Sequence, residues 1–276
     1  MPRLTLPALI ALFALLVVAT AVSSASRARA ERDRQERSEA REPAAGGPSD
    51  GAQLVSTSEP TAAGEVQPRP APKPQPTFGL AKVRTGRSVA LRGRPRGRTV
   101  ARVASRTEFG SARVLAVTEV RGRWLGVTSE ARPNGRLGWV HSRSEALKLS
   151  RTRVSLHADL SRRRLELRRG RRVVKRITVT VGRPGSRTPT GRFAVTDKLS
   201  GTSYGSYYGC CILALSGHQP NLPPGWTGGD RLAIHGTDAP GTIGKAASAG
   251  CLRAADAPLR TLMRRVPVGT PIFIRR

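Results

Sequence analysis

The chain is poor in cysteine, aromatic residues and negative charge, and each shortage narrows the classes of protein to which it can belong. Three cysteines, an odd number, leave one free thiol even where disulfides form. Aromatic residues make up 4% of the 276 residues, and we find no aromatic RNA-binding strand, recognition helix or zinc pattern. Only 18 acidic residues oppose 48 basic ones, and this net charge of +30 argues against an ordinary cytosolic metabolic enzyme. The hydrophobic content of 38% still permits a packed core and makes wholesale disorder a poor hypothesis.

The positive charge lies in the parts of the chain that look folded. Residues 27–78 carry 8 basic and 8 acidic residues, whereas 79–150 carry 16 against 4 and 151–276 carry 23 against 6. The basic residues interleave with strand-like apolar positions, which predicts a basic outer face of a sheet. Such a face favours a polyanionic partner, whether nucleic acid, an anionic membrane or an acidic cell envelope. The excess of Arg (42) over Lys (6) is also typical of a GC-rich genome.

The N-terminus predicts export. Residues 4–26 contain no charge and are largely Leu, Ala, Val, Ile and Phe after a single Arg3. Ala19-Thr20-Ala21 fits the small-x-small pattern of a signal peptidase site, but the apolar run is also long enough to span a bilayer. We therefore expect residues 1–26 to be either a cleaved signal peptide or a membrane anchor. Both place the rest of the chain outside the cytoplasm.

Residues 27–78 are predicted to be a disordered, Pro- and Ala-rich linker. They contain few large apolar residues, and prolines alternate along residues 68–76. Burial cannot offset the ordering entropy of such a segment, and the prolines make it a semi-rigid spacer. The linker would hold the folded part away from the membrane.

Residues 79–150 predict a small β domain. Short apolar runs at 100–103, 114–117 and 124–127 are spaced by turn residues, without helical periodicity. The segment Trp124-Leu125-Gly126-Val127 and the later Gly138-Trp139-Val140 resemble bacterial SH3-like domains. That resemblance implies a small barrel that either binds cell-wall peptide or glycan, or serves as a packing or spacer unit.

Residues 151–276 are expected to be mainly β as well. Residues 154–156, 164–168 and 173–181 alternate apolar and polar positions, as half-buried antiparallel strands do. One helix is predicted over 254–265, ended by Pro267, and a last strand over 270–274.

A histidine and a cysteine in this region point to nucleophilic catalysis. His235 ends an apolar strand, and Cys251 follows sixteen residues later, just before the predicted helix. An imidazole near a thiol can take its proton, and a helix N-terminus lowers a thiol pKa further. N–H groups around Cys251 could form an oxyanion hole, with Gly250 allowing close approach of substrate. From spacing alone, a buried Cys and a satisfied His remain the alternative.

The flanking residues resemble the catalytic, YkuD-type domain of L,D-transpeptidases across essentially all of 151–276. The resemblance is carried by His235-Gly236, by Ser248-x-Gly250-Cys251-x-Arg253, and by an upstream Thr-Pro-Thr-Gly-x-Phe at 188–193. It implies a β-sandwich with one or two short helices and an enzyme that cross-links peptidoglycan stem peptides in the 3-3 manner. A Cys thioester would form as D-Ala leaves a tetrapeptide stem. No cofactor is implied.

The resemblance also assigns roles. Cys251 would be the nucleophile, His235 its general base, and the Gly236 backbone carbonyl would orient the imidazole. Ser248, Gly250 and Arg253 would serve substrate binding or the oxyanion, with Arg253 able to pair with a stem carboxylate. Ala249 departs from the commonest motif, which has His there, so substrate fit or rate is expected to differ.

Several further residues are considered for the substrate groove, for a disulfide and for a metal site. Tyr208, together with Tyr207 and His218, could line the substrate groove. Cys210 and Cys211 are expected to be two buried thiols, with a vicinal disulfide as the alternative. No metal site is expected, because the four histidines have no ligand spacing with the cysteines.

Four hypotheses remain: the transpeptidase, including a hydrolytic, carboxypeptidase-like use of its site; a cysteine peptidase; a non-catalytic wall-binding protein; and a nucleic-acid binder. In the peptidases that pair with SH3-like domains the Cys precedes the His, opposite to this order. The intact motif around His235 and Cys251 argues against a wall-binding protein whose catalytic site has decayed. Export from the cytoplasm argues against nucleic acid as the partner. We therefore expect a monomeric, extracytoplasmic enzyme of the cell wall, secreted or anchored to the outer face of the cytoplasmic membrane, with peptidoglycan stems and the anionic envelope as partners.

Overall fold

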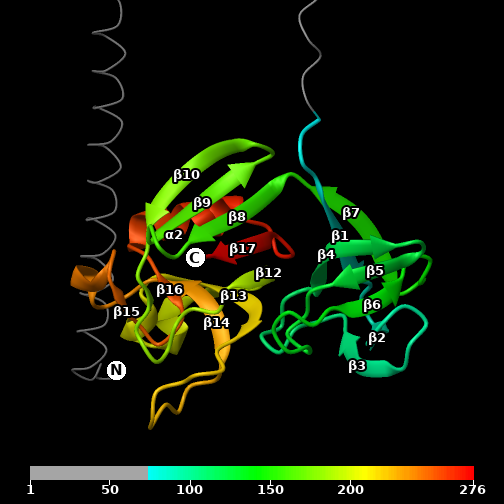
Figure 1. The fold of residues 1–276 in the computed structure, drawn as a ribbon, viewed down its shortest axis with the longest axis horizontal. Coiled ribbons are helices and arrows are strands. Elements are labelled where there is room, and N and C mark those ends of the chain that lie inside the picture. The colour runs from blue at the N-terminus through cyan, green and yellow to red at the C-terminus, as the bar shows by residue number, and fades with distance from the viewer. Residues whose placement is uncertain (1–73) are drawn as a thin grey trace, which may run out of the picture. The chain divides into compact units, whose positions relative to one another are not determined.

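The computed structural model describes residues 74–276, and these residues are mainly β as the sequence predicts (Figure 1). The predicted export segment 1–26 lies outside the described residues, as does all but the end of the predicted linker 27–78. No helix within residues 74–276 is long and apolar enough to cross a membrane. The described residues all fall within one compact unit, which contains two sheet systems.

The first sheet system, here called the β-module, spans residues 78–152. Its seven strands pair only in antiparallel fashion, in the order β3-β2-β6-β5-β4-β1-β7. The three apolar runs of the sequence correspond to β3, β4 and β5, and the Gly138-Trp139-Val140 segment corresponds to β6. The strands are β1 (Phe78–Val83), β2 (Ser88–Arg92), β3 (Thr99–Ala104), β4 (Val114–Arg121), β5 (Trp124–Val127), β6 (Gly138–His141) and β7 (Leu147–Thr152).

The second sheet system, here called the C-terminal region, spans residues 154–275. Eight of its strands follow the order β10-β9-β8-β17-β12-β13-β14-β16, and β11 and β15 form a separate pair. The strands are β8 (Val154–Asp159), β9 (Arg164–Arg169), β10 (Arg172–Thr178), β11 (Val181–Gly182), β12 (Gly191–Ser200), β13 (Cys211–His218), β14 (Arg231–His235), β15 (Ala246–Ser248), β16 (Leu252–Arg253) and β17 (Pro271–Arg275).

Strand β12 joins the two halves of this region, one formed by β10, β9, β8 and β17 and the other by β13, β14 and β16. Its first four residues, 191–194, pair with β17, whereas its later residues pair with β13. The register shifts between Val195 and Asp197, where an irregularity lets the strand change partners. One long strand thereby belongs to both halves, as in sandwiches whose strands switch sheets.

The helix begins later than the sequence predicts. Helix α2 spans Asp256–Arg265, not 254–265, because residues 252–253 pair with β14 as strand β16 and the Ala254 N–H donates to the His235 carbonyl. Three short 3-10 turns, η1 (Gly201–Tyr204), η2 (Ser206–Tyr208) and η3 (Pro240–Thr242), complete the described elements.

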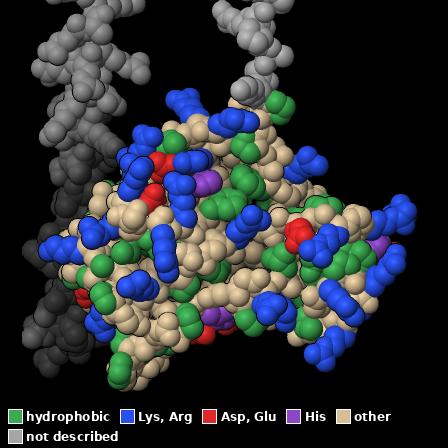
Figure 2. Space-filling model, viewed as in Figure 1, with side chains coloured by type: hydrophobic (Ala, Val, Ile, Leu, Met, Phe, Trp, Pro, Cys, Tyr) green, Lys and Arg blue, Asp and Glu red, His purple; other side chains and the backbone are tan. Residues whose placement is uncertain are grey.

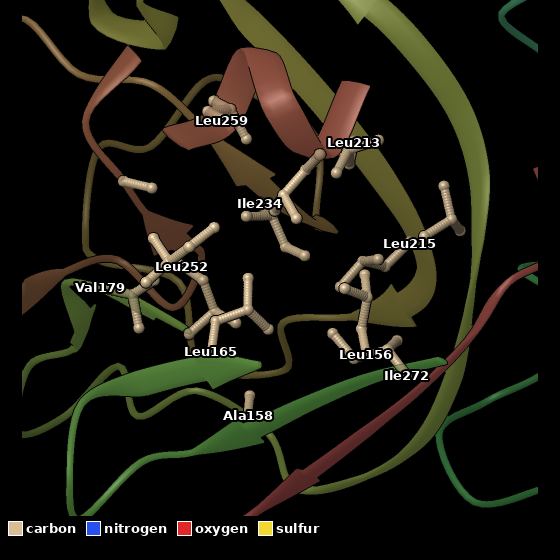
Figure 3. Close-up of a cluster of buried hydrophobic side chains, with 14 of the residues drawn as sticks. Leu156, Ala158, Leu165, Val179, Leu213, Leu215, Ile234, Leu252, Leu259 and Ile272 are labelled. Carbon is tan, nitrogen blue, oxygen red and sulfur yellow. The ribbon is translucent and has the colours of Figure 1, made fainter. Parts of the chain in front are cut away.

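The core of the C-terminal region lies between its two halves (Figure 3). Leu156, Leu165 and Ile272 enter it from β8, β9 and β17, and all three are fully buried. Leu213 of β13 and Leu259 of α2 enter from the opposite side. Burial of such side chains contributes about 1.5–3 kcal/mol each, which holds the strands that carry His235 and Cys251 in a fixed register.

Candidate active site

His235 and Cys251 lie on neighbouring strands. His235 is the last residue of β14, and Cys251 immediately precedes β16. The two strands pair in parallel, with Ile234 opposite Leu252 and His235 opposite Arg253. Both His235 and Cys251 line a pocket of about 40 Å³. Sheet pairing thus brings together the two residues that the sequence separates by sixteen positions.

His235 is a neutral base whose tautomer is set by its own neighbour. Its side chain is fully buried, and Nδ1 lies 2.7 Å from the Gly236 carbonyl oxygen. Burial, aided by the nearby Arg253 charge, lowers the His235 pKa to about 4. Because a carbonyl only accepts hydrogen bonds, Nδ1 carries the proton and Nε2 carries the lone pair. Nε2 is buried and has no hydrogen-bond partner among residues 74–276.

Cys251 is a thiol rather than a thiolate at rest. Burial raises the pKa of its thiol, opposed by a backbone hydrogen bond from Ala233 and by the Arg253 charge. Sγ lies 3.9 Å from the Arg231 carbonyl oxygen. The expected position just before a helix is wrong, because β16 follows Cys251 and α2 begins only at Asp256.

The loop before Cys251 is fixed by Ser248 and by Gln219. Ser248 Oγ donates to the Cys251 carbonyl at 2.6 Å and accepts the Gly250 N–H at 3.1 Å. Gln219 Nε2 donates to the Ala249 carbonyl at 3.0 Å. Gly250 has φ +124°, and a Cβ there would collide with the Gln219 amide. Ser248 and Gly250 thus hold the loop, and the Gly250 N–H is already engaged.

Gln219 also reaches a second loop and was not predicted. Its Nε2 lies 3.1 Å from the Arg187 carbonyl, so one buried amide ties residues 186–187 to residue 249. In the sequence Gln219 simply follows His218 and belongs to no motif that would mark it as a functional residue.

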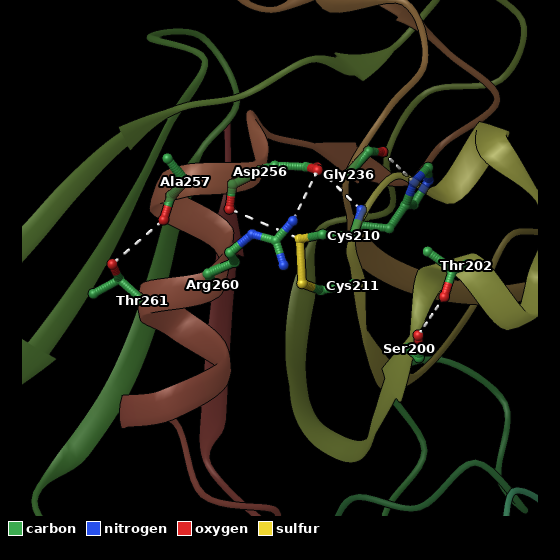
Figure 4. The surroundings of a disulfide bond; sticks show 10 residues. Ser200, Thr202, Cys210, Cys211, Gly236, Asp256, Ala257, Arg260 and Thr261 are labelled. Carbon is green, nitrogen blue, oxygen red and sulfur yellow. Dashed lines mark hydrogen bonds and ion pairs between the residues drawn. A yellow bond between two sulfur atoms is a disulfide. The ribbon is translucent and has the colours of Figure 1, made fainter. Parts of the chain in front are cut away.

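Cys210 and Cys211 form a disulfide instead of the expected two thiols (Figure 4). Both are buried at the start of β13. The Cys211 carbonyl accepts the Gly236 N–H at 3.1 Å, and the Cys210 N–H donates to Asp256 Oδ1 at 3.1 Å. The disulfide-bonded pair thus links the backbone beside His235 to the first residue of α2. Cys251 is the free cysteine, as an odd count predicts.

Gly236 is required by close packing. A Cβ at this position would lie 2.6 Å from Asp256 Oδ1 and 2.8 Å from both Gly209 Cα and the Tyr208 carbonyl oxygen. The Gly236 carbonyl can approach His235 because the residue itself has no side chain.

Arg253 and the two tyrosines enclose the histidine. Arg253 is buried, its Nη2 donates to the Tyr207 hydroxyl at 2.7 Å, and its guanidinium lies 4.7 Å from the centroid of that ring. The rings of Tyr208 and Tyr207 lie 5.0 and 5.5 Å from the His235 ring. Both tyrosines line the Cys251 pocket, and burial raises both of their pKa values.

The other histidines lie elsewhere. His218 Nδ1 lies 3.0 Å from Asp230 and its Nε2 2.8 Å from the Glu130 carbonyl, outside the Cys251 pocket. His141 is in β6 and His157 in β8. Within residues 74–276 no three His, Cys, Asp or Glu residues are grouped to hold a metal.

Comparison with known proteins relates the C-terminal region to one enzyme family. Residues 153–274 match the family model of the L,D-transpeptidase catalytic domain, YkuD. YkuD of Bacillus subtilis is 33% identical over 114 residues, covering 41% of this chain and 60% of that protein. YqjB of the same organism is 31% identical over 106 residues, with 35% and 57% covered. The chain thus spans about 60% of the length of the curated relatives it matches.

Solved structures give a weaker likeness. An L,D-transpeptidase from Mycobacterium smegmatis is 17% identical with a TM-score of 0.35, covering 51% of this chain and 73% of that one. L,D-transpeptidase 3 from Mycobacterium tuberculosis is 16% identical with the same TM-score, covering 51% and 74%. The resemblance of the C-terminal region to L,D-transpeptidase catalytic domains is therefore confirmed by sequence. The likeness of the β-module to SH3-like domains stays a prediction.

Proposed function

We propose that the C-terminal region is a peptidoglycan L,D-transpeptidase with Cys251 as nucleophile and His235 as general base. The observation that carries the proposal is the presence, in one pocket, of a neutral thiol and an imidazole whose Nε2 lone pair has no hydrogen-bond partner among the described residues. A resting thiol and a neutral base suit proton transfer during attack rather than a standing ion pair.

The acylation step follows from this protonation state. Sγ attacks the carbonyl between the third stem residue and the terminal D-Ala while its proton passes to His235 Nε2. The C–N bond then breaks, the proton goes to the leaving amine, and D-Ala departs to leave a Cys251 thioester. The Gly250 N–H is already bound to Ser248, so we infer that the Cys251 N–H serves the oxyanion.

Arg253 acts on both partners of the same step through its charge. It stands opposite His235 in the sheet, and its positive charge lowers the pKa values of both His235 and Cys251. It therefore favours the Cys251 thiolate and disfavours the His235 imidazolium, so the proton stays on His235 only briefly before it passes to the leaving amine. Tyr207 covers its guanidinium, so contact between Arg253 and a stem carboxylate requires that ring to shift.

The site of action follows from the proposed chemistry and from the basic surface. Figure 2 shows Lys and Arg side chains spread over the visible face. On the β9–β10 hairpin three arginines, Arg164, Arg168 and Arg176, surround the single carboxylate of Glu166, and hydrogen bonds from Arg168 and Arg176 lower its pKa. We infer that this basic surface holds the enzyme near an anionic envelope outside the cytoplasm, with an affinity that falls as salt rises.

The test is a covalent adduct on one cysteine. Full-length protein is mixed with a disaccharide tetrapeptide or a carbapenem, and the intact mass is followed beside the release of D-Ala. We expect an adduct in the wild type and none in Cys251→Ala, because no other thiol is free in the described residues. Absence of an adduct on folded protein, or an adduct that persists in the variant, contradicts the proposal. A wall-binding protein that has no catalytic activity would form no adduct.

The fate of the adduct separates transpeptidation from hydrolysis. A cross-linked dimer shows an amine acceptor, whereas a tripeptide alone shows that water was the acceptor.

A further inference from the structure

A groove of about 380 Å³ lies at the β10 edge of the C-terminal sheet. Its lining comes from β8, β9 and β10, which are neighbours in the sheet (Figure 1), and from the last residue of α2. Within the described part of the chain it shares no lining residue with the Cys251 pocket. Its volume is in the range of small-molecule binding sites. The groove is therefore a second site, which the proposed chemistry at Cys251 does not explain.

Three aliphatic side chains form the apolar part of the lining. Leu167 of β9 belongs to the main hydrophobic cluster, whereas Val154 and Val174 are only partly buried and pack against that cluster. The pairing of β10 with β9 is irregular at Val174, between Val173 and Lys175. An apolar surface that stays partly open to water is stabilised when an apolar ligand covers it. The interior of the groove thus suits a hydrocarbon chain.

Three arginines, Arg168, Arg169 and Arg265, form the rest of the lining. Arg168 donates to the Glu166 carboxylate at 2.5 and 2.9 Å, so its charge is already paired. Arg169 and Arg265 are exposed, and neither forms an ion pair within residues 74–276. No acidic residue of the described chain lines the groove. Its two unpaired guanidinium groups therefore attract an anion, and their planar forks suit phosphate oxygens.

We propose that this groove binds an anionic phospholipid of the membrane, with the phosphate against the two unpaired arginines and an acyl chain along the three aliphatic side chains. A free phosphate leaves the aliphatic side chains open to water, and a lipid without net charge leaves the arginines uncompensated. An anionic lipid satisfies both parts of the lining. The bound lipid fixes the orientation of the C-terminal region on the membrane, which the diffuse attraction of a basic surface does not do.

Photo-cross-linking from the acyl chain tests the site. Full-length protein is mixed with phosphatidylcholine vesicles that contain a phosphatidylglycerol with a diazirine on its acyl chain, and peptides are analysed by mass spectrometry after irradiation. We expect cross-links at Val154, Leu167 or Val174. A phosphatidylcholine with the same diazirine should give about fivefold fewer cross-links there, because its head group has no net charge. Cross-links in residues 1–26 are not counted, since an apolar segment inserts with either lipid.

A double variant removes the two unpaired charges. Arg169→Gln with Arg265→Gln should lower the phosphatidylglycerol cross-links in the groove at least about fivefold, because each charge contributes to the attraction of an anionic lipid. The matched control is Arg171→Gln with Arg264→Gln, which removes two exposed charges from the same hairpin and the same helix, outside the groove lining. Its cross-links should stay within about twofold of the wild type, because these charges act only diffusely.

A second variant tests the apolar part of the lining. Val174→Trp fills the groove without changing its charge, so cross-links at Val154 and Leu167 should fall at least about fivefold as the apolar contact with the chain is lost. Thermal melts check that this variant remains folded. Glycerol phosphate, added to the wild type at the concentration of the anionic lipid, should leave the cross-links nearly unchanged, because it supplies the anion without the chain.

Several results refute the site. If no cross-link forms in the groove, the groove is covered by the chain's own linker, by a second copy of the chain or by nothing. Equal losses in the two arginine double variants show that charge acts only diffusely. Equal cross-linking from both lipids, or competition by glycerol phosphate, shows that the groove does not recognise the lipid as a whole. None of these measurements uses D-Ala release, so their failure is distinct from a failure of the proposed function.

Discussion

The β-module and the C-terminal region differ in which polar side chains they bury. The β-module packs Ala, Val and Leu side chains, such as Leu91 and Val127, and also buries the polar Arg113 and Thr128. The C-terminal region has a larger apolar cluster and buries His235 completely, with no hydrogen-bond partner for its Nε2 among residues 74–276. Burying a polar group without a full set of partners costs free energy. Both regions carry this cost, but only in the C-terminal region does it fall on the proposed catalytic base.

The largest expected effect comes from replacing the buried base. In His235→Phe the ring keeps its approximate shape but loses the Nε2 lone pair, so we expect kcat/KM for D-Ala release to fall by about 10³-fold or more. The free energy of unfolding should change by less than about 1 kcal/mol, because the variant loses the Gly236 hydrogen bond but also an unpartnered buried atom. Donor-substrate kinetics and chemical denaturation measure the two quantities. A loss of activity matched by a loss of folding contradicts a catalytic role for His235.

Core truncations compare the two regions directly. Leu91→Ala in the β-module and Leu213→Ala in the C-terminal region each remove a fully buried side chain, at a cost of about 2–5 kcal/mol. Leu213 pairs with Ile234, the neighbour of His235, so its variant should also slow adduct formation on Cys251. Leu91→Ala should leave that rate nearly unchanged while the protein remains folded. Thermal melts and intact-mass kinetics test this, and equal slowing by both variants shows that the two cores are not independent.

The sequence allows the two residues that are proposed to react to be selected, but not their surroundings. His235, Gly236 and Cys251 lie in short motifs, and the Gly236 carbonyl takes the predicted position against the imidazole. Gln219 lies about thirty residues from the loop that it holds, and a single sequence carries no sign of that contact. Residues 252–253 belong to a two-residue strand whose pairing with β14 is set by tertiary structure.

The distribution of charge in the fold shows the same limit of prediction from a single sequence. Composition predicts a basic protein, yet Glu108 and Asp230, which are distant in the sequence, line the same cleft together with Arg231 and His218. Local periodicity predicts strands, whereas their order and the cleft between two sheet systems depend on contacts between distant residues.

The smallest predicted effect is a pH dependence of stability that comes from the C-terminal region. Burial holds the pKa of His235 at about 4, below the value of about 6.5 expected in the unfolded chain. The unfolded state therefore binds more protons between these values, so the contribution to stability is complete above pH 6.5 and is lost as pH falls toward 4.

His157 of β8, whose pKa burial also lowers to about 4, contributes with the same sign. From pH 6.5 to 5.5 we expect His235 to account for a loss of about 1 kcal/mol in the free energy of unfolding. Urea denaturation across this range should show a shallower pH slope in His235→Phe than in the wild type. His157→Gln is the control, and it should leave the His235 contribution to the slope in place. If the wild type and His235→Phe show the same pH slope, His235 is not held neutral by burial.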